Sequence, residues 1–217
     1  MKEGGGRPRA DFRLYLITDR FGCAGRPLVK VVEEALKGGV KGVQLREKDL
    51  PSLDMYELAV EMRRLTRLYG AKMLVNDRID IAMAVGADGV HLGERSVSPV
   101  VARKLLGEKG LIGVSCHGVE AAVAAWKGGT DFITLGPVYL TPSKAEYGEP
   151  LGLSPLAEAA HLVEIPVFAI GGIKPMNVSE PLSAGARGIA LISAILSADD
   201  PRREAQSLLA LIDQQEE

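Results

Sequence analysis

Four segments of the chain resemble one another, and this repeat limits the possible folds more than any other feature. They are GGVKGVQL (38–45), VGADGVHL (85–92), GGTDFITL (128–135) and AGARGIAL (184–191). Each has glycine within its first two positions, as suits the end of a helix, where only glycine enters the left-handed region without cost. Each then continues into Val, Ile or Leu, which favour a strand. The copies begin 43 to 56 residues apart, about two strand–helix units.

Further strands are expected between the copies, at 12–18, 71–76, 111–115 and 165–172. Segments with helical periodicity alternate with them, and one of these, 98–107, opens with a Ser-Pro pair and closes with glycine. Strands that are buried on both faces and separated by helices pair in parallel. The sequence therefore predicts an α/β fold, a single-domain (β/α)8 TIM barrel over residues 1–217 with 1–11 as an N-terminal tail. An open doubly wound sheet is the alternative.

Composition narrows the function classes. The formal net charge is −2 over 217 residues, so no global field recruits nucleic acid or an anionic membrane. Cys23 and Cys116 are too few for a disulfide framework and fit a reducing compartment. The charged N-terminus has no apolar region after it, and no apolar run is long enough for a membrane span. A cytoplasmic enzyme or binding protein for small molecules is expected, and a homo-oligomer remains open.

In a (β/α)8 barrel the functional face lies at the C-terminal ends of the strands, so the residues after each strand were read for chemistry. The second strand runs into VQLREKDL (43–50), which crowds charges at one end. Alternation along an extended chain points Gln44, Arg46 and Lys48 toward the barrel mouth, and Glu47 and Asp49 away from it. The two cations could hold phosphate oxygens. A solvated ion-pair cluster is the competing interpretation.

Other strand ends add polar groups. Asn76 could donate to a diphosphate together with Lys144, and Asp77 could hold magnesium or simply cap the next helix. His117, after the fifth strand, could act as acid or base or serve as a structural hydrogen-bonding residue. The 139–152 loop is long and contains glycine and prolines, which suits a lid.

The seventh and eighth strands end in Gly171-Gly172 and Ile192-Ser193. Glycine lets the backbone approach an anion closely, and the loops after these two strands are the usual phosphate site of this fold. The competing interpretation is that the glycine pair only turns the chain.

Six motifs on successive strand ends resemble the thiamine phosphate synthase and thiazole tautomerase family. They are QLREK (44–48), VNDR (75–78), GVHLG (89–93), GVSCH (113–117), GPVYLTPSK (136–144) and IGGI (170–173). The resemblance extends from residue 14 to residue 195. It implies a (β/α)8 enzyme of thiamine biosynthesis that acts on small phosphorylated substrates: a transferase that couples hydroxymethylpyrimidine diphosphate to thiazole phosphate. In the tautomerase branch, His117 would shuttle a proton to aromatise the thiazole. A non-catalytic binder of thiazole or thiamine phosphate is the third interpretation.

The resemblance also implies roles for individual residues. Gln44 would touch the pyrimidine, and Ser115 would lie near it and the departing oxygens. The diphosphate would be held by Arg46, Lys48, Asn76 and Lys144. The thiazole substrate would be held by Thr141, Ser143, Gly172, Ile192 and Ser193.

The metal site departs from the synthase pattern, in which an acidic residue after the fourth strand joins Asp77 in binding Mg²⁺. Ser96 stands at that place in this chain, and a hydroxyl brings no charge to the metal. Arg95 would weaken cation binding further if it pointed inward. A hypothesis for the second ligand is that Glu94 moves in to complete the site.

Overall fold

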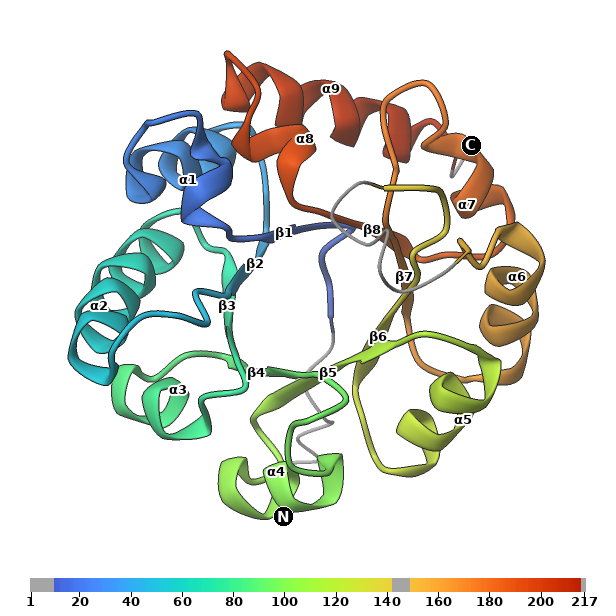
Figure 1. Ribbon diagram of the computed structural model, residues 1–217, viewed down its shortest axis with the longest axis horizontal. Helices are drawn as coiled ribbons and strands as arrows, with labels where there is room; N and C mark the ends of the chain where they lie inside the picture. The colour runs from blue at the N-terminus through green and yellow to red at the C-terminus, as the bar shows by residue number, and fades with distance from the viewer. Residues whose placement is uncertain (1–9, 142–148, 216–217) are drawn as a thin grey trace, which may run out of the picture.

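Eight parallel strands close into a barrel in the order β1 to β8, with helices around the outside (Figure 1). The computed structural model describes residues 10–141 and 149–215. Closure confirms the predicted (β/α)8 barrel and rules out the open sheet, because β8 pairs with β1. Within the described chain, no helix combines the length and apolarity that a membrane span needs.

The strands are β1 (Leu14–Ile17), β2 (Gly42–Leu45), β3 (Lys72–Asn76), β4 (Gly89–Leu92), β5 (Leu111–Cys116), β6 (Phe132–Leu135), β7 (Val167–Ile170) and β8 (Gly188–Leu191). The helices are η1 (Arg20–Cys23), α1 (Leu28–Lys37), α2 (Ser52–Leu68), α3 (Ile79–Val85), α4 (Pro99–Leu106), α5 (Val119–Lys127), α6 (Leu153–Leu162), α7 (Ser179–Ser183), α8 (Ser193–Leu196) and α9 (Pro201–Asp213).

The four repeated segments are the even-numbered strands together with the turns that lead into them. The second residue of each copy is a glycine with positive φ, as the sequence predicted for the end of a helix: Gly39, Gly86, Gly129 and Gly185. The predicted cap of α4 is also confirmed, because the Ser98 hydroxyl accepts the Val101 N–H at 3.4 Å.

The fifth position of the repeat controls how the barrel interior is filled. It is glycine in three copies and Phe132 in the fourth. A Cβ on Gly42 would lie 2.6 Å from the Phe12 ring, and one on Gly188 would lie 2.7 Å from the Phe168 ring. The missing side chains therefore make room for aromatic rings that close the N-terminal end of the barrel.

The N-terminal segment contributes to this plug earlier than expected. Ala10 is only 5% exposed and packs in the inner cluster with Phe12 and Tyr15. The predicted tail of residues 1–11 is therefore wrong at Ala10, whose methyl group is buried under the barrel. Residues 1–9 lie outside the described part of the chain.

The fourth position of the repeat holds two ion-paired aspartates at the same end, of which Asp131 is buried and Asp88 is half-buried. Asp131 accepts from Arg103 of α4 and from the Ile112 N–H of β5, both at 2.7 Å. Asp88 makes the equivalent contacts two strand–helix units earlier, with Arg63 of α2 at 2.7 Å and the Met73 N–H at 2.8 Å. Each aspartate thus ties a helix to the start of a strand, which is a structural task.

Candidate functional site

The charged segment after β2 leaves the barrel at its C-terminal rim. The strand ends at Leu45, and residues 48 and 49 already lie in a turn, so the predicted alternation does not extend to Lys48. The Arg46 N–H donates to the buried Thr18 hydroxyl at 2.8 Å, and the Thr18 N–H donates to the Gln44 carbonyl at 2.9 Å. These bonds tie the ends of β1 and β2 together and hold Arg46 at the rim.

Glu47 and Asp49 serve the loop rather than the mouth, as predicted. Arg20 donates to Asp49 at 2.6 Å and to Glu47 at 3.2 Å, and its own backbone N–H also reaches Glu47 at 3.2 Å. The Glu47 carboxylate is buried beneath this contact. The competing interpretation of a solvated cluster of Arg46, Glu47, Lys48 and Asp49 is therefore wrong in its partners, because among the described residues both carboxylates pair with Arg20 and the Glu47 side chain is buried.

The cations Arg46 and Lys48 share one electrostatic environment with Asp77 of the β3 end. The pKa of Lys48 is lowered by desolvation of its ammonium group and by the positive charges of Arg46 and Arg95, while Asp77 acts in the opposite direction. The Lys48 ammonium thus lies within reach of two other positive charges and of the Asp77 carboxylate. An anion with more than one negative charge would relieve their mutual repulsion.

The proposed metal position was tested on the residues that surround Asp77. Asp77 has φ of +65°, uncommon for a residue with a side chain, and its N–H is held by the His91 carbonyl at 3.0 Å. The Ser96 hydroxyl accepts the Gly93 N–H at 2.7 Å and so shapes its own loop. Glu94 is exposed in the same turn. Among the described residues, no three His, Cys, Asp or Glu side chains gather into a metal site.

A polar layer forms the floor below this rim. It comes from the seventh position of the repeat, which holds Gln44, His91, Thr134 and Ala190. His91 is 1% exposed, and its Nε2 lies 3.0 Å from the Ser115 hydroxyl of β5. Burial, and then the charge of Arg46, lower the pKa of His91 to about 3, so the imidazole is neutral. Sequence reasoning gave His91 and Thr134 no role, although the repeat places both in one layer with Gln44.

His117 lies at the rim between β5 and β6. Its Nδ1 donates to the Gly136 carbonyl at 2.6 Å, which leaves Nε2 as the acceptor of the neutral ring. This bond supports the structural interpretation of His117 and also fixes a tautomer that an acid–base role would use.

The glycine pair after β7 packs against the segment that follows β6. Both residues have positive φ, and a Cβ would lie 2.6 Å from Pro137 at Gly171 and 2.6 Å from Tyr139 at Gly172. The side chain of Asn177 bonds the Gly172 carbonyl at 3.2 Å. The glycines therefore permit close loop packing, beside the start of α8 where Ile192 and Ser193 lie. Phosphate binding at this place stays a prediction.

The long loop after β6 leaves the barrel through a paired neck. The Leu151 and Gly152 N–H groups donate to the carbonyls of Pro137 and Val138 at 2.8 and 3.1 Å. Thr141 is half-buried beyond this neck. The predicted Ser143 and Lys144, like the middle of the predicted lid, lie outside the described residues.

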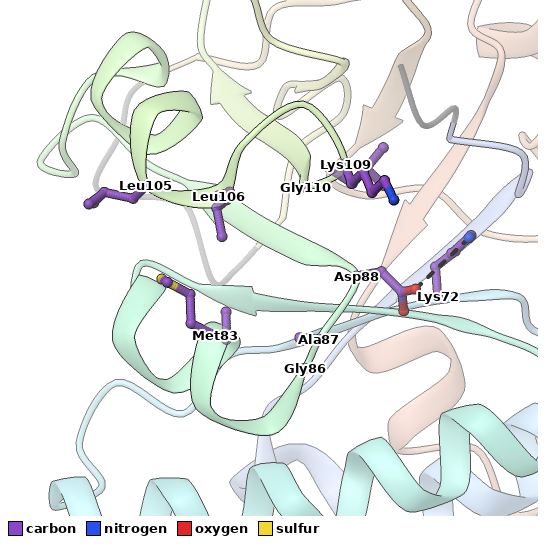
Figure 2. A pocket seen from close by; sticks show the side chains of 11 residues that line it. Lys72, Met83, Gly86, Ala87, Asp88, Leu105, Leu106, Lys109 and Gly110 are labelled. Atoms are coloured by element: carbon purple, nitrogen blue, oxygen red, sulfur yellow. Dashed lines mark ion pairs between the residues drawn. The ribbon is translucent and has the colours of Figure 1, made fainter. Parts of the chain in front are cut away.

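A pocket of about 400 Å³ lies at the opposite end of the barrel, between α3 and α4 (Figure 2). Lys72 and Asp88 form an ion pair at its edge, and Met83, Leu105 and Leu106 supply apolar walls. These residues lie at or before the starts of strands or on the outer helices, so the pocket belongs to the stabilising end of the fold and contains none of the predicted site residues.

Comparison with known proteins gives the family of this chain. Residues 14–195 match the family model described as thiamine monophosphate synthase. The chain is 61% identical to a Geobacter sulfurreducens protein provisionally named thiamine-phosphate synthase, over 94% of this chain and 96% of the relative. It is 44% identical to the thiamine-phosphate synthase of Clostridium novyi, over 91% of this chain and 97% of the relative.

A solved structure, the thiamine phosphate pyrophosphorylase of Pyrococcus furiosus, superposes with a TM-score of 0.87 at 39% identity, covering 94% of this chain and 96% of the other. Sequence and fold thus agree over nearly the whole length. The chain belongs to the thiamine monophosphate synthase family.

Proposed function

We propose that this protein is a thiamine phosphate synthase, which couples hydroxymethylpyrimidine diphosphate to a thiazole phosphate and releases diphosphate. The observation that carries the proposal is the rim group of Arg46, Lys48 and Asp77, whose charges interact at the ends of the strands β2 and β3, beside the buried polar residues Gln44 and His91 of the same barrel, in a member of this family. The positive charges of the rim would suit a diphosphate. The polar side chains of the floor would suit a flat heterocycle that has hydrogen-bonding groups on its edges.

The reaction breaks the bond between the pyrimidine methylene carbon and the diphosphate oxygen. The bonding electrons leave with the diphosphate, and the thiazole nitrogen then supplies an electron pair to the methylene cation. Such a step needs stabilisation of the leaving group more than it needs a base. Arg46 offers two parallel N–H donors to the leaving oxygens, and Lys48 offers a mobile charge. Asn76 and Lys144 are proposed to complete this group.

The two heterocycles are proposed to bind at different strand ends. Gln44 and Ser115 lie on either side of His91 and would meet the pyrimidine edges. Thr141, Ser143, Gly172, Ile192 and Ser193 would meet the thiazole substrate, the last three through its phosphate. Backbone N–H groups at the start of α8 suit an anion.

The described residues of this site would offer magnesium one carboxylate, that of Asp77. Mg²⁺ is commonly held by one or two carboxylates together with substrate phosphates, so Asp77 and the diphosphate would hold it here. When bound, the ion would neutralise part of the diphosphate charge. Because the Ser96 hydroxyl brings no charge and already accepts the Gly93 N–H, we propose that the metal associates mainly as a complex with the substrate.

Replacing Ser96 by Asp is expected to lower the magnesium concentration that gives half-maximal activity by several fold, because the variant restores the carboxylate that the synthase pattern has at this place. An aspartate oxygen can also keep the Gly93 N–H bond. Rates are measured at saturating substrates against magnesium concentration. Val97→Asp, which adds the same charge at the neighbouring exposed position, is the matched control. Equal shifts in both variants would contradict a local metal effect.

Substrate binding is expected to weaken at alkaline pH through Lys48. Its pKa is lowered, so the ammonium loses its charge at a lower pH than an ordinary lysine. The KM for the pyrimidine diphosphate should therefore rise as the pH increases toward about 10. Lys48→Arg stays charged throughout this range and should keep a low KM. Superimposable pH profiles for the wild type and Lys48→Arg would disprove the role of this charge.

A second candidate function is the thiazole tautomerase activity. It is favoured by Ser96 and Arg95 at the place of a carboxylate and by the fixed tautomer of His117. In that reaction His117 would move one proton on the thiazole ring, without diphosphate or metal.

One experiment separates the candidates. Both phosphorylated substrates are supplied with and without magnesium while thiamine phosphate is assayed, and aromatisation of the thiazole tautomer is followed in parallel. Magnesium-stimulated thiamine phosphate supports the synthase. Aromatisation that is lost in His117→Ala supports the tautomerase. Tight binding of thiazole phosphate without either reaction would identify a binding protein and overturn the proposal.

A further inference from the structure

A chain of hydrogen bonds crosses the barrel interior beneath the rim. Gln44 Nε2 donates to the Tyr15 hydroxyl at 3.3 Å, and this hydroxyl lies 3.3 Å from His91 Nδ1. His91 Nε2 continues the chain to the Ser115 hydroxyl at 3.0 Å. Gln44, Tyr15 and His91 are each at most 1% exposed. Four strands are thus connected by a network that is buried at Tyr15, Gln44 and His91 and half-buried at Ser115.

Counting hydrogens fixes the direction of this chain. The Tyr15 oxygen already accepts from Gln44, and burial raises the pKa of Tyr15, so its own hydrogen needs an acceptor. The neutral His91 ring offers one acceptor nitrogen, which must be Nδ1 to receive that hydrogen. With the Gln44 NH₂ group donating to this oxygen, the opposite tautomer would leave the phenol hydrogen facing a donor, and a buried unsatisfied donor is strongly unfavourable.

This direction of hydrogen-bond donation determines which groups Ser115 and Gln44, at the two ends of the chain of hydrogen bonds, can offer to a ligand. With Nδ1 as acceptor, His91 carries its proton on Nε2 and donates to the Ser115 oxygen. The Ser115 hydrogen is then released to donate outward. At the other end the Gln44 amide uses its NH₂ group on Tyr15, so its carbonyl oxygen is turned outward as an acceptor.

We propose that His91 is a positioning residue of the pyrimidine site, which, with Tyr15, presents one hydrogen-bond donor on Ser115 and one acceptor on Gln44. This inference rests on the synthase function proposed above. An aminopyrimidine has the complementary edge, a ring nitrogen that accepts beside an amino group that donates. His91 never touches the substrate, and its effect passes through the two neighbours.

Kinetics test the proposal. His91→Asn and Tyr15→Phe are each expected to raise the KM for the pyrimidine diphosphate about tenfold, the loss of roughly one hydrogen bond. The KM for thiazole phosphate should change little. In a Ser115→Ala background, His91→Asn should raise this KM clearly less than the tenfold expected for it alone, because one of the two groups through which it acts is already gone. His161→Asn, an exposed histidine of α6, is the control with unchanged kinetics.

Equal increases in both KM values, or additive effects of His91→Asn and Ser115→Ala, would mean that His91 acts only as packing and would overturn the proposal. Tyr15→Phe keeps the ring in the aromatic cluster, so the test survives if His91→Asn does not fold.

Nitrogen NMR of the wild-type imidazoles gives a measurement that needs no activity. The signal that is absent from His91→Asn should show a neutral ring protonated at Nε2 between about pH 5.5 and 8. A ring protonated at Nδ1, or a charged ring in that range, would overturn the proposal. An inactive wild type with the Nε2 proton present would instead refute the synthase function and leave the hydrogen-bond direction supported.

Discussion

Arg46→Ala is expected to lower kcat/KM for thiamine phosphate formation about 10²- to 10³-fold, the usual effect of removing one preorganised donor to a developing anion. The backbone of Arg46 is held at the rim by the hydrogen bond from its N–H to the Thr18 hydroxyl, so the position from which its side chain extends is fixed. Its guanidinium would meet the departing oxygens with two donors, and alanine offers none. Steady-state rates with both substrates and saturating magnesium measure the loss.

Arg64→Ala, on the exposed face of α2, is the matched control and should retain wild-type rates. Arg46→Lys keeps the charge but loses the fork, so it should lie between the wild type and Arg46→Ala. If Arg46→Ala kept kcat/KM within a few fold of the wild type, the diphosphate would have to bind elsewhere, and the role of the rim would be wrong.

Most of the fold could be predicted because individual positions of the repeat have the same structural role in each copy. The second residue of each copy ends a helix, the fourth precedes the strand, and the fifth and seventh point into the barrel. The glycine positions predicted the helix ends correctly, since only glycine fits there without strain. The closing pair of β8 and β1 followed from the number of units, because an open sheet would leave these strands with unpaired edges.

The candidate site was predicted less completely, for physical reasons. Alternation placed Gln44 inside the barrel correctly, but it does not reach Arg46 or Lys48, because β2 ends at Leu45 and the chain turns at Lys48. The direction of these two side chains toward the mouth stays a prediction. The partner of Glu47 and Asp49 is Arg20, a residue of the neighbouring loop that no local pattern indicates. Such contacts depend on which loops meet at the rim.

The role of His91 was missed because it stands within an otherwise apolar strand and because its hydrogen-bonding neighbours are far away in sequence. Tyr15 precedes it by 76 residues and Ser115 follows it by 24. A usable signal was present, since the seventh repeat position is polar in three of four copies: Gln44, His91 and Thr134. Polar residues at one level inside a barrel must satisfy one another or a ligand.

Arg103→Leu is expected to destabilise the protein by about 3–5 kcal/mol, the largest stability effect that we predict for a single side chain. Arg103 bonds the Asp131 carboxylate at 2.7 Å and the Gly110 and Gly129 carbonyls, and the Asp131 side chain is only 4% exposed. Without the guanidinium, the buried charge of Asp131 would keep one hydrogen bond among the described residues, from the Ile112 N–H. Urea unfolding followed by circular dichroism measures the loss.

The equivalent ion pair of Arg63 and Asp88 provides a comparison for this loss of stability. Asp88 has a side chain that is 22% exposed and a second cation, Lys72, at 3.9 Å, so Arg63→Leu should cost clearly less than Arg103→Leu. The double variant Arg103→Leu/Asp131→Asn should be more stable than Arg103→Leu alone, because it removes the stranded charge while the amide oxygen still accepts the Ile112 N–H. A double variant less stable than Arg103→Leu would show that the carboxylate stabilises the barrel without its partner. Because these pairs lie at the end opposite the rim, the kinetic constants of folded variants should stay unchanged.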